Sequence, residues 1–254
     1  MAFRGGNLQP AHRGYRYQDI ATAYFLVRSL SARYDEVVVD RKQVLDDLLD
    51  DLEVVAAGSR VRRQFKSSDN AGRLLRERDF SNRSSILRMD RLVLSFVRAG
   101  IAAADEYRLC ATWGTPPEAD PLHKLLVPVQ GIKSFETSRA TLYKLDGETI
   151  WPADRAPLWP SLEEYQSEDA EFGRSGFLKF CGRFCVELNL PMASSELSEP
   201  GELERAVLRE LVERVGIGRY PNNNRAAEDV AAYAFALANQ ARTESRSLSP
   251  ADIE

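Results

Sequence analysis

The chain has 254 residues, 44% of them hydrophobic, so it can bury a substantial core in one large domain or two smaller ones. No run approaches the roughly eighteen apolar residues of a membrane span, and the start lacks the apolar core of a signal peptide, which predicts a cytoplasmic protein with no membrane partner. Three cysteines and two histidines are too few for a disulfide framework or an ordinary zinc site, so oxygen atoms would hold any metal.

Helix and strand patterns alternate in the first part of the chain. Apolar residues at three- and four-residue spacing from Tyr17 to Leu30 predict an amphipathic helix. Short β-branched runs predict strands at residues 36–40, 51–57 and 60–66. The last two runs flank Gly58 and form a hairpin. A second helix over residues 80–99, with Ile86 on its apolar stripe, and a buried strand over 106–114 follow.

The proline-rich segment 115–170 predicts loops and short helices, with Asp146–Trp151 as a hairpin turn. Residues 177–191 predict a helix that leads into an edge strand, and 226–242 predict a final alanine-rich helix. Between them an apolar helical stripe is expected either to dock on the rest of the chain or to pair with another copy; its members are Leu203, Val207, Leu211 and Val215. The alternation predicts an α/β fold.

The net charge of -4 conceals a strong local asymmetry. Residues 35–53 hold eight acids and two bases, whereas residues 60–98 hold eleven bases and four acids. The basic segment predicts an affinity for double-stranded DNA that falls steeply with salt. We expect the phosphate contacts to come from Arg62, Arg73, Arg76 and Arg83. Alternatively, the arginines after Lys66 form only the polar face of a helix.

The stretch "DDLEVVAAGSRVRRQFKSS" predicts a metal site at the end of the hairpin. Side chains alternate along a strand, so Asp51 and Glu53 share one face, as do Gln64 and Lys66. Asp51 would bind Mg²⁺ (or Mn²⁺) directly, and Gln64 would add a side-chain oxygen. Lys66 would position or deprotonate the attacking water, or stabilise the charge on the reacting phosphate.

Several interpretations of this stretch stay open from the residues alone. The metal ligand could be any of the neighbouring aspartates, Asp46, Asp47 or Asp50, as well as Asp51. The acidic run could also be a solvated loop before a strand. Gln18, on the first helix, would be a supporting site residue together with Asp50 and Glu53, or a structural hydrogen-bonding group.

These motifs, preceded by "GYRYQDIATAYFLV", resemble the PD-(D/E)XK restriction-endonuclease superfamily in its variant with Gln in place of the second acid. In particular, they resemble the nuclease domain fused to sensor modules in bacterial antiphage defence proteins. In this resemblance Gly14, Tyr17 and Gln18 match the opening helix, Asp51 the metal aspartate, and Gln64 and Lys66 the terminal pair. It covers roughly residues 12–113 and implies a restriction-endonuclease-like core with a central mixed sheet flanked by helices, plus a C-terminal helical segment.

The expected function is a Mg²⁺-dependent, largely sequence-nonspecific DNA endonuclease that serves as the effector of a defence protein. The alternative is a nuclease-like domain without catalysis that binds nucleic acid or assembles partners. We expect the nuclease domain to span residues 1–192 and a helical extension to span 193–254. The closing "SLSPADIE" is a helix-start pattern with no helix after it, which favours a fused sensor module or self-association.

Overall fold

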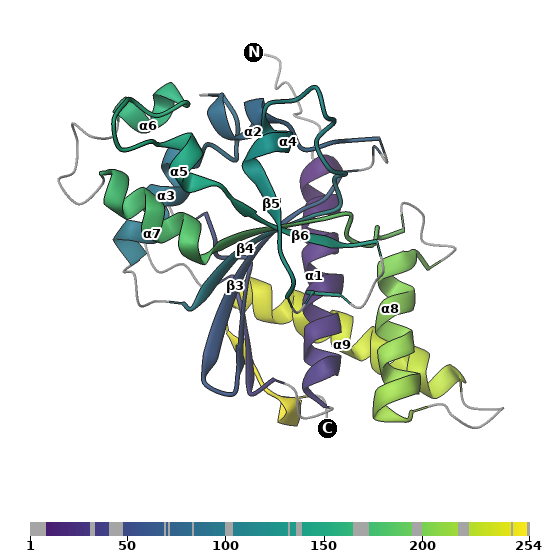
Figure 1. Cartoon of the computed structure of the whole chain (residues 1–254). Coiled ribbons are helices and arrows are strands. Elements are labelled where there is room, and N and C mark those ends of the chain that lie inside the picture. The colour runs from purple at the N-terminus through teal and green to yellow at the C-terminus, as the bar shows by residue number, and fades with distance from the viewer. Residues whose placement is uncertain are drawn as a thin grey trace, which may run out of the picture.

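One mixed sheet with helices on both faces forms the centre of the molecule (Figure 1). The computed structural model describes residues 9–30, 34–40, 48–68, 70, 72–82, 84–99, 104–131, 133–135, 139–164, 173–194, 200–217, 224–244 and 246–252. The α/β class with a central mixed sheet is confirmed, and the arrangement is compatible with a restriction-endonuclease-like core. No helix in these ranges is both long enough and apolar enough to cross a membrane.

The sheet has eight strands in the order β5-β6-β7-β4-β3-β2-β1-β8. Their bounds are β1 Glu36–Val39, β2 Leu52–Ala56, β3 Ser59–Lys66, β4 Glu106–Ala111, β5 Leu126–Pro128, β6 Thr141–Leu145, β7 Phe184–Leu188 and β8 Ser247–Leu248. β3 pairs with β4, and β4 with β7, in parallel; all other neighbours in this order are antiparallel. The three strands predicted at residues 36–66 are confirmed within a residue or two at each end.

The predicted hairpin between β2 and β3 turns on two residues with positive φ, Ala57 at 50° and Gly58 at 80°. Positive φ at both central positions is the geometry of a type I′ turn, which matches the twist of the flanking strands. The turn sets the register, in which Leu52 lies opposite Arg63. This register decides which side chains meet at the far end of the hairpin.

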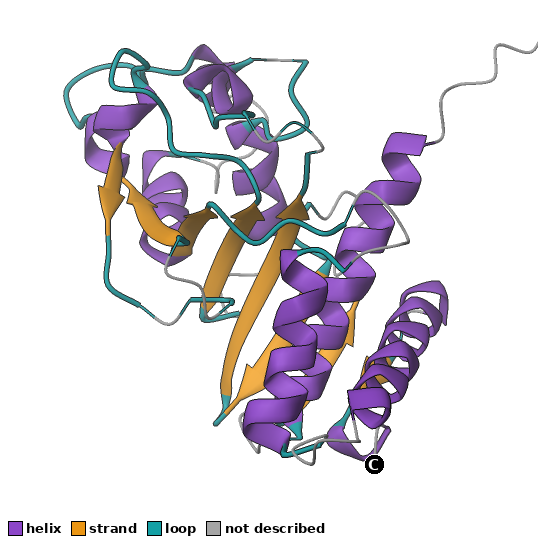
Figure 2. Cartoon of the chain, turned by 90° about the vertical axis from the view of Figure 1, so that its right-hand side faces the viewer, coloured by secondary structure: helices purple, strands orange, loops and turns teal. Residues whose placement is uncertain are grey.

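The helices cover the two faces of the sheet (Figure 2). Their bounds are α1 Gln9–Ser29, α2 Glu77–Ser81, α3 Met89–Ala99, α4 Leu122–Leu125, α5 Gly147–Ile150, α6 Pro160–Glu164, α7 Arg174–Arg183, α8 Glu202–Glu210 and α9 Asn224–Glu244. One hydrophobic core joins α3 and α7 to the sheet, and a second joins α1, α8 and α9 to the other face. The strands between them are therefore buried on both sides.

The helix predicted over residues 80–99 is wrong in its first half, because the chain forms α2, a loop and then α3. In the loop, Asn82 Oδ1 accepts a hydrogen bond from the Ser84 backbone N–H, and Ser85 Oγ accepts one from the Leu87 N–H. Such short polar side chains compete with helical hydrogen bonds. As a result Ile86, expected on an apolar stripe, is 68% exposed.

The segment 115–170 contains two strands, β5 and β6, that the sequence did not predict. They lie beyond β7, so β7 is an interior strand and not the expected edge. The hairpin turn predicted at Asp146–Trp151 is also wrong, because Asp146 caps α5 by accepting a hydrogen bond from the Thr149 N–H. A side chain that satisfies a free N–H at a helix start favours helix over turn.

The C-terminal segment packs against the rest of the chain. Leu203, Val207 and Leu211 are fully buried in the core with α1, so this stripe docks on the body, the first of the two expected arrangements. A π-helical turn, Leu211–Val215, continues α8, and β8 pairs with β1. The sheet and the second core therefore each contain residues from both sides of the expected boundary between residues 192 and 193.

Candidate active site

A pocket of about 350 Å³ opens where β1 and β3 end and β2 begins. Antiparallel pairing brings these strand ends together, because Val39 and Arg63 both lie opposite Leu52. The pocket is lined by all three predicted catalytic residues, Asp51, Gln64 and Lys66. Predicted supporting residues Gln18 and Asp50 also line it.

Asp51 lies just before β2, and its carboxylate accepts hydrogen bonds from β3. Its Oδ2 atom accepts one from Gln64 Nε2 at 2.6 Å and one from the Phe65 backbone N–H at 2.7 Å. The Gln18 side chain, on α1, hydrogen-bonds the same carboxyl group. Because the Phe65 N–H lies beyond the last β2–β3 pair, the carboxylate takes the place of a strand partner there. Asp51 is thereby held in one position at the end of the sheet.

Burial raises the pKa of the Asp51 carboxyl above its ordinary value. The Lys66 charge and the hydrogen bonds from Phe65, Gln18 and Gln64 act in the opposite direction but do not cancel this effect. The ionised carboxylate is therefore incompletely compensated by the protein groups around it. A cation at this position would stabilise the ionised form, which is the form that binds metal ions.

Lys66 follows Gln64 by two residues, so both side chains leave the same side of β3, as predicted. Phe65, between them, points to the opposite face and packs in the core with α1. Lys66 lines the pocket, and its charge acts on Asp51. The ammonium group can therefore bind an anionic oxygen, or hold a water molecule, in the space that the carboxylate faces.

The donor atoms at the pocket fit Mg²⁺ or Mn²⁺. Asp50 and Asp51 bring carboxylate oxygens, and Gln64 would present its Oε1 after a half-turn of its amide group. Among the residues that the structure describes, no three His, Cys, Asp or Glu side chains form a metal-binding group. A metal ion here would thus take one or two carboxylates and complete its shell with amide, backbone and water oxygens, the pattern usual for Mg²⁺.

The other acidic candidates differ in position. Asp50 is buried, at 8% exposed, and lines the pocket beside Asp51. Glu53 lies on the expected face but not in the pocket lining, because its carboxylate is buried between Arg60, at 3.3 Å, and Arg62, at 3.7 Å. Its predicted supporting role is therefore replaced by a structural one. Asp46 and Asp47 lie outside the described residues.

The predicted DNA-binding arginines do not form one exposed group. Arg62, on β3, is buried, with its side chain 2% exposed and paired with Glu53. The prediction that it contacts phosphate at the surface is therefore wrong. Arg73 pairs with Asp79 and stacks at 4.5 Å on the Trp113 ring. The hydrogen bond and stacking hold its guanidinium against the protein and reduce what it can offer to DNA.

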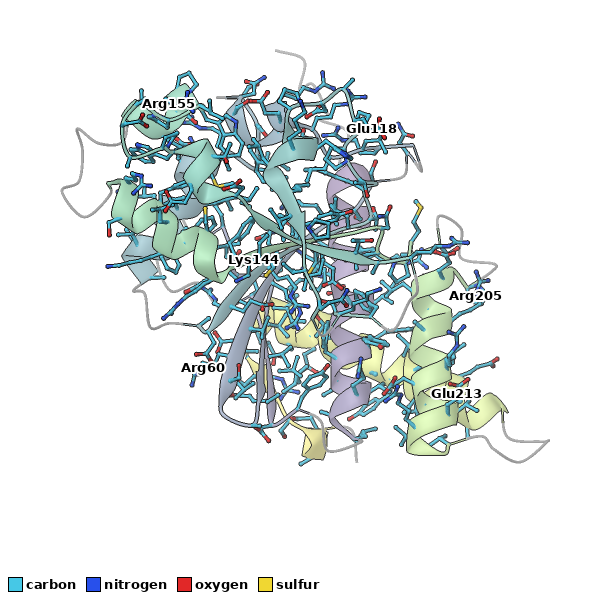
Figure 3. All side chains as sticks on the ribbon, viewed as in Figure 1. Arg60, Glu118, Lys144, Arg155, Arg205 and Glu213 are labelled. Carbon is cyan, nitrogen blue, oxygen red and sulfur yellow. The ribbon has the colours of Figure 1, made fainter. Side chains whose placement is uncertain are left out.

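Arg76 is available to DNA, because its side chain is 42% exposed and its Nη1 lies as far as 4.0 Å from Asp120 Oδ2. Arg83 lies outside the described residues. Figure 3 shows exposed side chains of both signs spread over the molecule, for example Arg60 and Glu118. The basic segment of the sequence is thus dispersed by folding and partly neutralised.

The pocket is also lined by three polar residues that were not predicted from the sequence as site residues: Tyr15, Asp40 and Arg242. Asp40 directly follows β1 and has a positive φ of 50°, a conformation that aspartate adopts more readily than most residues. An acid at the end of a predicted strand was a usable signal for Asp40. Nothing in the local pattern connects Arg242, on α9, with Tyr15, on α1.

The sequence matches no model of a known protein family, and a search of curated proteins finds no similar sequence. The chemistry of the pocket must therefore be inferred from its own residues.

Proposed function

We propose that the chain is a metal-dependent DNA endonuclease with little sequence preference, of the effector type that its motifs resemble. One observation carries this proposal: a partly buried Asp51 carboxylate, fixed by Gln64 and the Phe65 N–H, faces a pocket that also holds Lys66. A carboxylate and an amide oxygen can hold a divalent ion, and an ammonium group beside them can stabilise the negative charge that develops in phosphodiester hydrolysis. A domain that only binds nucleic acid has no need of such a pocket.

The chain's own residues divide the work. A divalent ion at Asp51, with Asp50 and Gln64 as further oxygen donors, would supply positive charge and a more acidic water at the reacting phosphate. Gln18 and the Phe65 N–H hold the Asp51 carboxylate in place. Lys66 donates hydrogen bonds to the attacking water, or to the phosphate oxygens whose negative charge grows in the transition state.

Plasmid cleavage with added Mg²⁺, Mn²⁺ or EDTA tests the proposal. We expect cleavage with either metal ion and none with EDTA. Lys66→Ala should abolish cleavage, whereas Glu118→Gln, which changes an exposed carboxylate outside the pocket, should cleave as the wild type does. Metal-independent cleavage, or full activity in Lys66→Ala, would contradict the proposal. DNA binding without cleavage would instead support the non-catalytic alternative.

A further inference from the structure

Arg242 brings a second cation to the pocket from a distant part of the chain. It lies near the end of α9, which packs along α1, and it lines the pocket together with Asp51 and Lys66. Among the described lining residues, Lys66 and Arg242 are the basic ones, against the three carboxylates of Asp40, Asp50 and Asp51. An anionic substrate entering this pocket would therefore depend on Arg242.

The guanidinium of Arg242 is held in a fixed orientation. Its Nε donates to Asp19 Oδ1 at 2.8 Å and its Nη2 to Asp19 Oδ2 at 3.2 Å. The guanidinium carbon lies 4.7 Å from the centre of the Tyr15 ring, and Asn239 Nδ2 also donates to Asp19 Oδ2, at 2.9 Å. Within the described part of the chain, Nη1 makes no hydrogen bond, so its two N–H groups remain for a ligand.

A purely structural role explains this arrangement less well. The contact between α1 and α9 is already apolar, since Ala231, Ala234 and Ala238 are buried in the second core. The Arg242–Asp19 pair, with side chains 18% and 13% exposed, adds a contact between the two helices but leaves Nη1 unused. The pair does fix the guanidinium plane, and a fixed arginine fork is well suited to bind phosphate.

We propose that Arg242 is a substrate-binding residue whose Nη1 donates to a phosphate of the nucleic-acid backbone in the pocket. This inference rests on the proposed function for the identity of the substrate. Asp19 and Tyr15 are positioning residues, because they act through the guanidinium. The active site would thus be completed by α9, from the segment after residue 192.

The test compares Arg242→Gln and Arg242→Lys with Arg246→Gln. Arg246 is a matched control, because it lies just after α9, pairs with Asp252 at 3.5 Å and is not in the pocket lining. Three quantities are measured for each variant of the 254-residue chain: affinity for a short fluorescent DNA duplex in Ca²⁺, cleavage kinetics in Mg²⁺, and melting temperature. Ca²⁺ supplies a divalent cation in the binding assay. A gel verifies that the duplex stays uncut in Ca²⁺.

We expect Arg242→Gln to weaken duplex binding and to raise KM about ten-fold or more, the effect of losing a charged hydrogen bond. Arg242→Lys should recover part of this loss, and Arg246→Gln should match the wild type.

If the wild type cleaves DNA and Arg242→Gln matches Arg246→Gln in binding and KM, the inference is wrong while the proposed function stands. If the wild type binds but never cleaves, and only Arg242→Gln loses affinity, the phosphate contact stands without catalysis. If the wild type neither binds nor cleaves, both are wrong.

Discussion

Two groups of polar side chains on opposite faces of the sheet have different surroundings. One group faces the pocket: Asp51, Gln64 and Lys66. The other, which we call the enclosed cluster, lies beneath α1 and consists of Arg63, Arg108, Ser134 and Glu187. Adjacent residues of β3, Arg63 and Gln64, thus belong to different groups because side chains alternate along a strand.

The side chains of the enclosed cluster have hydrogen-bond partners within the protein. Glu187 is fully buried, and its carboxylate accepts from Arg108 Nη1 at 3.2 Å and from the Ser134 N–H at 2.7 Å. Arg63 donates to Ser134 Oγ at 3.1 Å, and burial, followed by the nearby Arg108 charge, lowers its pKa. The pocket instead leaves a carboxyl with a raised pKa facing open space. Buried polar side chains with partners inside the protein indicate a structural role, whereas buried polar side chains beside a cavity indicate a ligand-binding role.

The largest expected effect is on activity, at the pocket. Asp51→Asn keeps the size of the side chain but removes the charge that would hold the metal ion, so cleavage should fall roughly a thousand-fold, about 4 kcal/mol. Initial rates of plasmid nicking in Mg²⁺ measure this. Circular dichroism should show an unchanged fold. Near-normal rates in Asp51→Asn would move the metal ligand to another aspartate, with Asp50 the first candidate.

The next effect is on stability, at the enclosed cluster. Glu187→Ala leaves Arg108 and the Ser134 N–H without their buried partner, so the free energy of unfolding should fall by about 3–5 kcal/mol. Urea denaturation measures this loss. Glu187→Gln keeps the hydrogen-bond acceptor and should lose less, which provides a variant that can still fold. If the free energy of unfolding fell by less than about 1 kcal/mol in both variants, the enclosed cluster would not have the structural role that distinguishes it from the pocket.

A smaller effect concerns the pH dependence of stability. A carboxyl whose pKa is raised by folding contributes stability below its unfolded pKa of about 3.9, and this contribution is lost as pH rises through the raised pKa. In the absence of metal, Asp51→Asn should therefore raise the free energy of unfolding at pH 7. The gain should be smaller than the loss caused by Glu187→Ala, and it should be absent at pH 3. Denaturation at both pH values tests this, and added Mg²⁺ should stabilise only the wild type. Equal stabilities at pH 7 would show that Asp51 is adequately compensated.

The smallest effect concerns Arg76, the exposed arginine among the described DNA-binding candidates. Arg76→Gln should weaken duplex binding only a few-fold, equally for unrelated sequences, and lower the salt dependence by about one phosphate contact. Binding at several salt concentrations measures both quantities. Arg62→Gln would instead act through stability, because Arg62 is buried with Glu53. An unchanged salt dependence in Arg76→Gln would place the DNA elsewhere.

The sequence predicts the hairpin and its site because both depend on local rules. Strand alternation places Gln64 and Lys66 on one side, and Gly58 with Ala57 sets the register that brings Asp51 to Gln64. The same local reasoning fails for Arg62. Charge density along the chain does not reveal which arginines turn inward to pair with a buried acid.

Other features depend on contacts between distant segments. The short strands β5 and β6 are stabilised by pairing beyond β7, which a short apolar run does not reveal. Ile86 leaves its predicted helix because neighbouring polar side chains bind the backbone of the loop. Arg242 reaches the pocket only because α9 packs along α1, so no spacing in the sequence connects it with Asp51.

The position of α9 also has a consequence for the order of synthesis. A nascent chain that ends before residue 224 already contains the β2–β3 hairpin with Asp51 and Lys66, but it lacks the pocket wall formed by Arg242 and the β8 strand that pairs with β1. Chains are synthesised at about 5–20 residues per second, so the pocket is completed several seconds after the hairpin has been made. Under the proposed function, the cell's DNA would meet a finished nuclease only after α9 and β8 have been made.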